Sequence, residues 1–253
     1  MRNKIILLLI LLILFLAGCA KTNIQKETPA VIDETQSSIT EESSMEKVDF
    51  KTDDEFRIAG NLWRGNKEAV LLLHQLNMNK DSYNSFAQKL NKAGFTVLAI
   101  DSRGHGESME QNGLKRNWND FSEQDFKAMV FDAKAAKEFL QREGFVLTSV
   151  VGASVGANTA LIFSALEPSI KKAVLLSPGL DYKGIQTEDV AKVARTKILI
   201  VASEEDAYSF GSSRALNRLL MNSEIKELNN AGHGTNMFIG TRLEFDVVKW
   251  LSG

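Results

Sequence analysis

The stretch Gly152-Ala153-Ser154-Val155-Gly156 joins two apolar segments in the middle of the chain. The run before it, Val146–Gly152, is typical of a buried strand, and the run after it, Val155–Leu166, is typical of a buried helix. A G-x-S-x-G sequence at a strand-to-helix turn predicts a nucleophile elbow, a sharp turn that exposes the serine hydroxyl. A phosphate loop is the alternative, but the stretch has no G-x-x-x-x-G-K-S/T pattern and no lysine. We therefore predict that Ser154 is a nucleophile.

Strands and helices alternate on both sides of this motif. A hairpin is expected from Val48–Phe50 and Phe56–Trp63. Continuous apolar strands that alternate with helices predict a mostly parallel sheet covered by helices on both faces, with function at the carboxyl ends of the strands. The further strands are expected at Ala69–His74, Phe95–Asp101, Val146–Gly152, Ile170–Leu176, Ile198–Ala202 and Glu224–Leu228, and the helices at Asp81–Ala93, Ser122–Glu143, Val155–Leu166, Ser212–Met221 and Thr235–Leu251.

A serine hydroxyl needs a base, and the chain has three histidines, His74, His105 and His233. Where a nucleophile elbow is used in this way, the chain order is serine, acid, histidine, so only His233 qualifies. The acid should follow the strand Ile198–Ala202, where Glu204, Glu205 and Asp206 are adjacent. Its role would be to fix the tautomer of the histidine and to stabilise the imidazolium. Spacing alone leaves the three acids open.

Taken together, these motifs resemble the α/β-hydrolase superfamily, over roughly Val48 to Gly253. The resemblance is to bacterial esterases, serine-peptidase-like members and dienelactone-hydrolase-like members. It is carried by Leu71-Leu72-Leu73-His74, by Asp101-Ser102-Arg103-Gly104-His105-Gly106-Glu107-Ser108, by the elbow, and by Ala231-Gly232-His233-Gly234. It implies an eight-stranded, mostly parallel sheet with helices on both faces and a leading β-hairpin.

The resemblance also implies roles for individual residues. It places the acid at Asp206 and makes His74 and His105 structural. It puts the two backbone N–H groups of an oxyanion hole at Leu76 and Val155.

Two positions depart from the family pattern. Gln75 stands where the family usually has glycine after His74, so its amide side chain is an alternative donor toward the site. Ser203 replaces a glycine in the acid loop.

The segment that carries a cap domain in many such enzymes is short here. Gly179 to Thr196 is 18 residues, enough for one short helix at Asp189–Ala194 and no cap domain. The loop Met109–Asn119, which contains Trp118, is either a surface connection or a second rim of the site.

The first residues are typical of a signal peptide. Arg2 and Lys4 precede twelve unbroken apolar residues, Ile5–Leu16, which is short for a span of about 20 residues. The sole cysteine follows in Leu16-Ala17-Gly18-Cys19 and resembles the lipobox of bacterial lipoproteins, in which this cysteine is lipidated. An ordinary secretory signal or an uncleaved anchor is the alternative. We expect a signal peptide over residues 1–18 and two acyl chains, such as palmitate, on Cys19 for stable anchoring.

Residues 19–47 are expected to form the lipidated cysteine and a disordered tether, because Ala20–Lys47 holds eight Ser or Thr, six Asp or Glu and no aromatic residue. Residues 48–253 should form one domain. The whole chain has 253 residues, 30 Lys plus Arg and 32 Asp plus Glu, so its charge of −2 gives no case for nucleic-acid binding. One cysteine excludes a disulfide framework.

We therefore expect a membrane-anchored, extracytoplasmic serine hydrolase that cleaves small carboxylic esters through Ser154, Asp206 and His233. No metal or organic cofactor is implied, and we expect a monomer. A peptidase or amidase with the same triad is one alternative. A non-catalytic binding lipoprotein on a hydrolase scaffold is the other.

Overall fold

The structure is a computed structural model that describes residues 44–253, within the compact unit Glu42–Gly253. The expected signal peptide, the lipidation site Cys19 and nearly all of the expected tether lie outside the described residues. Among the described residues, no helix is both long enough and apolar enough to cross a membrane.

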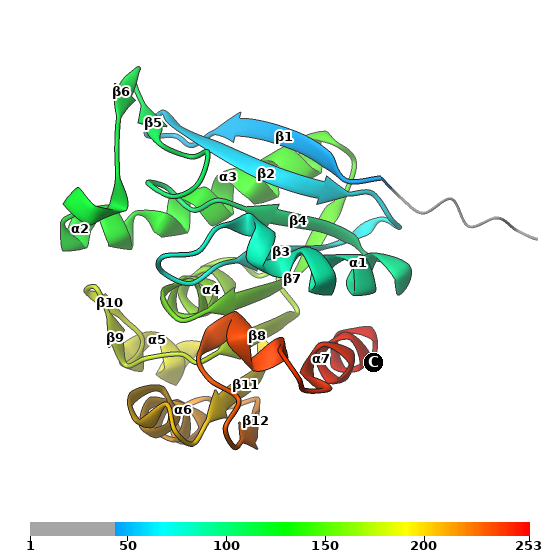
Figure 1. Cartoon of the computed structure of the whole chain (residues 1–253), viewed down its shortest axis with the longest axis vertical. Helices are drawn as coiled ribbons and strands as arrows, with labels where there is room; N and C mark the ends of the chain where they lie inside the picture. The colour runs from blue at the N-terminus through cyan, green and yellow to red at the C-terminus, as the bar shows by residue number, and fades with distance from the viewer. Residues whose placement is uncertain (1–43) are drawn as a thin grey trace, which may run out of the picture. The chain divides into compact units, whose positions relative to one another are not determined.

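A single large sheet runs through the molecule (Figure 1). Its strand order is β12-β11-β8-β7-β3-β4-β2-β5-β6, and β1 pairs with β2. The eight longer strands, which match the eight expected, are β1 (Glu46–Lys51), β2 (Phe56–Trp63), β3 (Glu68–Leu73), β4 (Thr96–Ile100), β7 (Val146–Ala153), β8 (Lys172–Leu176), β11 (Lys197–Ser203) and β12 (Ser223–Leu228). Two strands of two residues each, β5 (Glu110–Gln111) and β6 (Leu114–Lys115), extend the edge.

The pairing is parallel from β4 through β3, β7, β8 and β11 to β12, and antiparallel where β2 meets β4 and β1. The expected parallel sheet and leading hairpin are thus confirmed. Strand β1 begins at Glu46, two residues before the expected start of the domain, because Glu46 and Lys47 are already paired with Leu62 and Asn61. The carboxyl ends of the parallel strands meet at one edge of the sheet.

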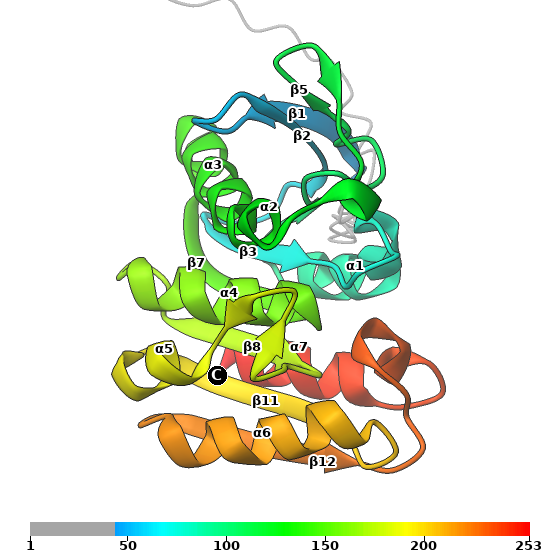
Figure 2. The same ribbon diagram turned by 90° about the vertical axis from the view of Figure 1, so that its left-hand side faces the viewer.

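The helices cover both faces of the sheet, as Figures 1 and 2 show. On one face lie α3 (Met129–Arg142), α4 (Val155–Leu166), α5 (Glu188–Val193) and α6 (Ala207–Leu219), and on the other lie α1 (Asn84–Lys92) and α7 (Leu243–Ser252). Strand β3 is apolar from Ala69 to Leu73, and its packing shows why. Leu71 and Leu73 pack into the core under α3 and α4, whereas Val70 and Leu72 pack into the core under α1 and α7. A strand buried on both faces has no polar side.

Three expected helices are each divided in the structure. The segment expected as Asp81–Ala93 begins as the 3-10 helix η1 (Lys80–Tyr83) and continues as α1. The segment expected as Ser122–Glu143 forms α2 (Glu123–Lys127) and α3, with Ala128 at the junction. The predicted cap at Ser122 and Asp125 is present as a capping box. The closing segment forms the 3-10 helix η3 (Gly234–Phe238) and then α7, because Gly240 at a φ of +68° interrupts the helix between them.

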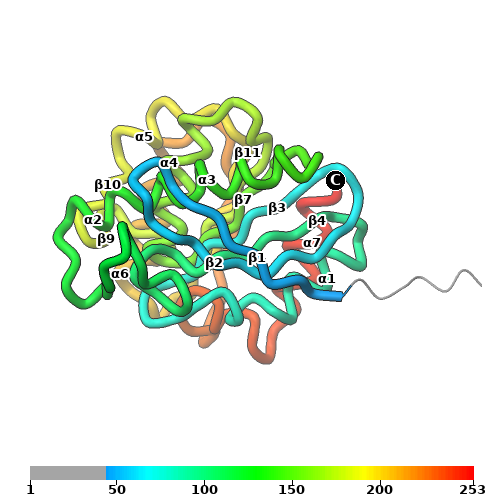
Figure 3. Tube along the Cα trace, turned by 90° about the horizontal axis from the view of Figure 1, so that it is seen from above, coloured from blue at the N-terminus to red at the C-terminus, as the bar shows by residue number. Residues whose placement is uncertain are grey.

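The segment Gly179–Thr196 carries no cap domain. It forms the short hairpin β9 (Asp181–Tyr182) and β10 (Ile185–Gln186), followed by the expected short helix as α5. Figure 3 shows this hairpin beside α2, and Figure 2 shows it next to α4. The hairpin was not expected from the sequence.

Candidate active site

Ser154 lies at the turn between β7 and α4, in a backbone conformation that few residues adopt. Its φ is 53° and its ψ is −118°, which stores strain where the hydroxyl is presented. The flanking glycines make this turn possible. A Cβ atom on Gly152 would collide with the carbonyl of Gly156, and a Cβ atom on Gly156 would collide with the carbonyl of Leu73. The sequence G-x-S-x-G therefore forms the sharp turn that was predicted from it.

The surroundings of Ser154 favour negative charge. Val155 is the first residue of α4, so its N–H has no acceptor within the helix and lies at the positive end of the helix dipole. Leu76, the other expected oxyanion residue, follows β3, the strand next to β7. Leu76 and Val155 pack in the same apolar cluster, with Met129 and Ile185. The two expected N–H donors thus come from neighbouring strand ends.

Asp206 and His233 are joined by a hydrogen bond of 2.6 Å between Oδ2 and Nδ1. Asp206 follows β11 and occupies the N-cap position of α6, and His233 follows the adjacent strand β12. The carboxylate can only accept at this contact, so the proton is on Nδ1, and Nε2 is left as the acceptor. A histidine held in this tautomer is prepared to take a proton through Nε2.

The other two acids of the loop behave differently. Glu204 is exposed and faces the side chain of Asn229. Glu205 accepts hydrogen bonds from the backbone N–H groups of Asn230 and Gly232 and from the hydroxyl of Ser203, at 2.8, 2.5 and 2.6 Å. The Ser203 hydrogen bond is the largest cause that lowers the pKa of Glu205, which is held at about 2. Glu205 therefore fixes the loop that carries His233.

The whole loop before and after His233 is held by side chains. The N–H of Ala231 donates to Ser203 Oγ, that of Gly234 to Ser177 Oγ, and that of Thr235 to Gln75 Oε1, at 3.0, 3.0 and 2.7 Å. Together with the two hydrogen bonds to Glu205, five backbone N–H groups of this loop donate to side-chain oxygens. The residues that carry these oxygens lie at the ends of β3, β8 and β11 or just after them. The position of His233 is thus set from three strand ends.

Gln75 and Ser203, the two departures from the family pattern, serve this same loop. The carboxamide oxygen of Gln75 accepts from both the N–H and the hydroxyl of Thr235, at 2.7 and 3.1 Å. Gln75 thereby ties the loop of Leu76 to the loop of His233. Sequence reasoning noted both substitutions but did not find their function. The available signal was a side chain with a hydrogen-bonding group where a glycine is usual.

Tyr182 of the β9–β10 hairpin faces the same centre. Its hydroxyl forms a 2.7 Å hydrogen bond with Ser209 Oγ, and Ser209 Oγ lies 3.5 Å from His233 Nδ1. The Tyr182 and His233 rings are perpendicular, with centroids 6.3 Å apart. Ser154 and His233 form no direct hydrogen bond in the described part of the chain, although such contacts are often long without substrate. Neither Tyr182 nor Ser209 was expected from the sequence.

Two further features border the site. Trp118 packs on the cluster that contains Val155. Residues 110–115 of the same loop form β5 and β6 at the edge of the sheet, so most of Met109–Asn119 is a surface connection, the first of the two alternatives. A groove of about 470 Å³ opens between the segment after Leu76 and the segment after His233, where Met78, Thr235 and Ile239 are among the lining residues.

His74 and His105 are buried and neutral. His74 Nδ1 donates to the Gln75 carbonyl at 2.8 Å, and its Nε2 accepts from the N–H of Ser102 at 3.0 Å. Burial lowers the pKa of His74 to about 4, with a further contribution from His105. His105 donates to the carbonyl of Arg103 at 2.9 Å and stacks on Trp118 at 5.4 Å. Both histidines hold loops together, as the resemblance implied.

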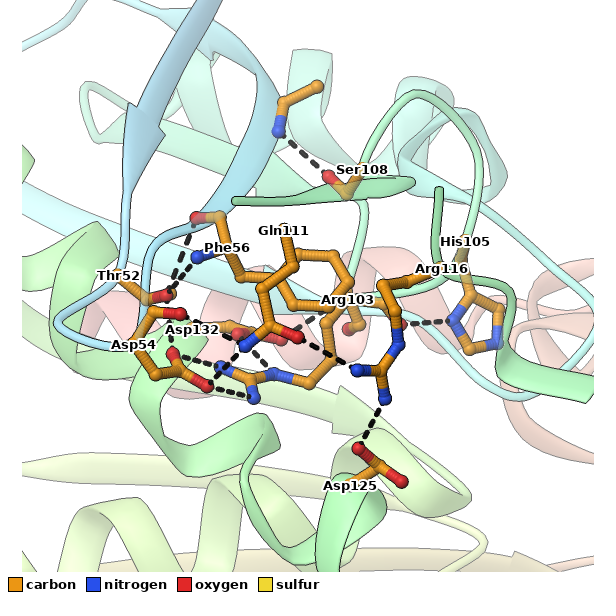
Figure 4. A network of polar contacts seen from close by, with 12 residues as sticks. Thr52, Asp54, Phe56, Arg103, His105, Ser108, Gln111, Arg116, Asp125 and Asp132 are labelled. Atoms are coloured by element: carbon orange, nitrogen blue, oxygen red, sulfur yellow. Dashed lines mark hydrogen bonds and ion pairs between the residues drawn. The ribbon is translucent and has the colours of Figure 1, made fainter. Parts of the chain in front are cut away.

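Figure 4 shows the polar network that fixes the loop after β4. Arg103 is 3% exposed and donates to Asp132 of α3 at 2.8 Å and to Asp54 of the β1–β2 turn at 2.8 and 3.0 Å. Burial raises the pKa of Asp132 to about 6, against the opposing effect of Arg103, so the pair remains ionised at neutral pH. Arg103 thus joins the hairpin, the loop and α3 at one point.

Among the described residues, no group of three or more His, Cys, Asp or Glu side chains is arranged to hold a metal ion.

The sequence is similar to known serine hydrolases. It is 30% identical to a monoacylglycerol lipase of Mycolicibacterium smegmatis over 124 residues, which are 48% of this chain and 42% of the lipase. It is 36% identical to the serine hydrolase BPHL of Mus musculus over 111 residues, which are 43% of this chain and 35% of that protein. The chain therefore aligns with less than half of the length of these relatives.

Solved structures show the same fold. An esterase of Pyrococcus furiosus superposes with a TM-score of 0.66 at 17% identity, over 83% of this chain and 90% of the esterase. A dienelactone hydrolase of Anabaena variabilis gives a TM-score of 0.65 at 17% identity, over 83% and 96% of the two chains. These likenesses confirm the α/β-hydrolase fold. A family model described as serine aminopeptidase, S33, matches residues 64–205, which include Ser154 and end one residue before Asp206. Because that match covers more than half of its residues, the chain belongs to this family of α/β-hydrolases.

Proposed function

We propose that the protein is a serine hydrolase that cleaves carboxylic esters, with Ser154, Asp206 and His233 as its triad. The observation that carries the proposal is the 2.6 Å hydrogen bond between Asp206 and His233. It fixes the histidine tautomer that a serine nucleophile requires, on the sheet edge where Ser154 occupies its elbow. Membership of a serine hydrolase family supports the same chemistry.

In the proposed reaction, Ser154 Oγ attacks the ester carbonyl while His233 Nε2 takes the proton of the hydroxyl. The carbonyl oxygen becomes an oxyanion, and the N–H groups of Leu76 and Val155 donate hydrogen bonds to it. His233 then gives its proton to the alcohol oxygen, the bond between carbon and alcohol oxygen breaks, and the acyl group stays on Ser154. Water, activated by His233, releases the acid and restores Ser154.

The surroundings favour substrates with small or well-exposed acyl groups. Only the β9–β10 hairpin and α5 occupy the segment where a cap domain would be inserted. Without a large cap to displace, the rate should show no jump when a substrate passes its micellar concentration. A sharp jump at that concentration would contradict this expectation.

A second candidate is cleavage of peptide or other amide bonds, which the family description of a serine aminopeptidase favours. The triad serves either bond, because both reactions pass through an acyl-enzyme.

The test is a panel of chromogenic esters and aminoacyl amides of matched acyl groups, run on the wild type and on Ser154→Ala. We expect ester turnover to exceed amide turnover, and kcat to fall by about 10⁶ in the variant. Full ester turnover by Ser154→Ala would show that the nucleophile is wrong, and no wild-type turnover would favour a binding protein.

We also propose that the mature protein is anchored to the extracytoplasmic side of the cell membrane through Cys19. The support is the sequence alone: the apolar run Ile5–Leu16 is followed at once by the only cysteine of the chain. Cys19→Ser should release the protein from the membrane fraction or leave it unprocessed. Unchanged mass and unchanged membrane partitioning of that variant would contradict the anchor.

A further inference from the structure

The β9–β10 hairpin is fixed to the helix that begins at the nucleophile. Asn158 of α4 is fully buried and uses both ends of its amide: Nδ2 donates to the Ile185 carbonyl at 2.8 Å, and Oδ1 accepts from the Gly179 N–H at 3.0 Å. Thr187 Oγ1 donates to the Gly179 carbonyl at 2.8 Å and closes the base of the hairpin. The hairpin is therefore held in a fixed position relative to Ser154.

Tyr182 is directed from this hairpin toward the reacting groups. Gly179 leaves room for its ring, since a Cβ atom there would lie 2.7 Å from Tyr182 Cε2. The half-buried ring packs on the cluster that contains Val155 and Leu76. At its end the hydroxyl contacts Ser209 Oγ at 2.7 Å, and the ring meets that of His233 edge to face. Tyr182 thus reaches from the expected oxyanion side across to the histidine.

The Tyr182 hydroxyl keeps its proton. Burial is the largest influence on the pKa of Tyr182 and raises it, whereas the hydrogen bond with Ser209 acts to lower it. The phenol is consequently neutral at physiological pH and keeps its proton as a hydrogen-bond donor. A neutral donor on a ring that packs beside Val155 and His233 has no part in the triad mechanism as described.

We propose that Tyr182 is a catalytic residue that donates a hydrogen bond to the alcohol oxygen of the ester as the bond to carbon breaks. The inference rests on the proposed function and deepens it. Two oxygens surround the carbon under attack: the carbonyl oxygen, bound by Leu76 and Val155, and the alcohol oxygen, which must face His233 to be protonated. The Tyr182 ring packs on the cluster that contains Val155, the neighbour of Ser154, and meets the ring of His233, so its hydroxyl lies on the side of the second oxygen. His233 still supplies the proton, and Tyr182 stabilises the negative charge that develops before the transfer is complete.

The role makes a prediction that a structural tyrosine would not. An alkoxide leaves poorly and depends on help at its oxygen, whereas 4-nitrophenolate is a stable anion that needs little. The experiment measures kcat/KM, which reports acylation, for ethyl butyrate and 4-nitrophenyl butyrate with the full-length protein. Tyr182→Phe keeps the ring and removes the hydroxyl. We expect it to lower kcat/KM about ten-fold for the ethyl ester and by no more than about two-fold for the nitrophenyl ester.

Tyr208→Phe is the matched control. Tyr208 packs on Tyr182 with ring centroids 5.5 Å apart, but its hydroxyl bonds the backbone N–H and carbonyl of Asp181. We expect its loss to change both substrates by the same factor. Nitrophenyl ester turnover by Tyr182→Phe shows directly that the variant is folded.

The possible results separate the two proposals. An equal loss on both esters in Tyr182→Phe would overturn the role of Tyr182 and leave the esterase proposal intact. A substrate-dependent loss in Tyr208→Phe as large as that in Tyr182→Phe would also overturn it, because the effect would then come from the hairpin and not from the hydroxyl. No turnover of either ester by the wild type would overturn both proposals.

Discussion

Asp206 Oδ2 lies 2.6 Å from His233 Nδ1, although 27 positions of the chain separate the two residues. They meet because β11 and β12 are adjacent and parallel, so that the loops after both strands leave the sheet at the same edge. The contact singles out one acid from three neighbours, since Glu204 and Glu205 have other partners.

The first prediction concerns this contact. Asp206→Asn should lower kcat by about 10⁴, because an amide no longer selects the tautomer with a free Nε2. Glu204→Gln is the matched control, and its kcat should stay within a few-fold of wild type. Both are measured at neutral pH with folding checked by circular dichroism. Near-full activity of Asp206→Asn would mean that another group orients His233.

The second prediction concerns Glu205. Its carboxylate holds the N–H groups of Asn230 and Gly232, so it acts as more than a solvated charge of the loop. In Glu205→Gln the new amide would turn an N–H donor toward one of these partners, so the loop of His233 should shift. We expect kcat to fall about ten-fold with KM nearly unchanged.

The same kinetic assay on Glu204→Gln supplies the baseline for this change. If Glu205→Gln has the kcat of that control, the loop is held well enough by Ser177, Ser203 and Gln75, and Glu205 is dispensable.

The third prediction is a loss of stability in acid that depends on His74. Its pKa is about 4 in the folded protein and about 6.5 in an unfolded chain, so the unfolded state binds the proton first as pH falls. The contribution of His74 to the free energy of unfolding is fully present above about pH 6.5. It is lost as the pH falls from there to about 4. It should amount to roughly 2–3 kcal/mol across that window.

Urea unfolding at several pH values measures this effect. The wild type should be more stable than His74→Leu at pH 7, and the difference should shrink toward pH 4. A difference that stays constant with pH would mean that His74 is not kept neutral by its surroundings.

The fourth prediction concerns the buried pair of Arg103 and Asp132, whose side chains are 3% and 1% exposed. Asp132→Ala should lower the free energy of unfolding by about 3–5 kcal/mol, because it leaves a buried guanidinium short of a partner. Asp53→Ala is the control: it removes an exposed contact with Lys134 and should cost less than about 1 kcal/mol. A loss as small as that of the control in Asp132→Ala would mean that Asp54 alone compensates Arg103.

Much of the fold could be predicted because its strands are buried on both faces. Strands β3, β4, β7, β8 and β11 are mostly apolar runs bounded by turns, because helices cover both faces of the sheet along them. Both ends of helix α4 were predicted correctly, because the helix is buried on almost every side. The divisions of the second and last expected helices were not predicted. They depend on local turns at Ala128 and Gly240, which leave the apolar pattern on either side unchanged.

The site could be predicted where the chemistry imposes a local pattern. The elbow needs glycines at fixed positions around Ser154, so it is visible in five residues. Tyr182 and Ser209 could not be found in this way. They lie on a hairpin and a helix that meet only in the folded chain, and neither has a motif of its own.

The attachment of His233 makes catalytic activity a sensitive indicator of the state of the sheet. The loop of His233 is held by hydrogen bonds to Gln75 after β3, to Ser177 after β8, and to Ser203 and Glu205 at the end of β11. A displacement of any one of these strand ends would move the imidazole, even if the core beneath stayed closed. On heating, inactivation should therefore begin before circular dichroism records a loss of helix. Heat-tolerant variants are then best selected by residual activity, since melting temperature alone would overlook the loop that fails first.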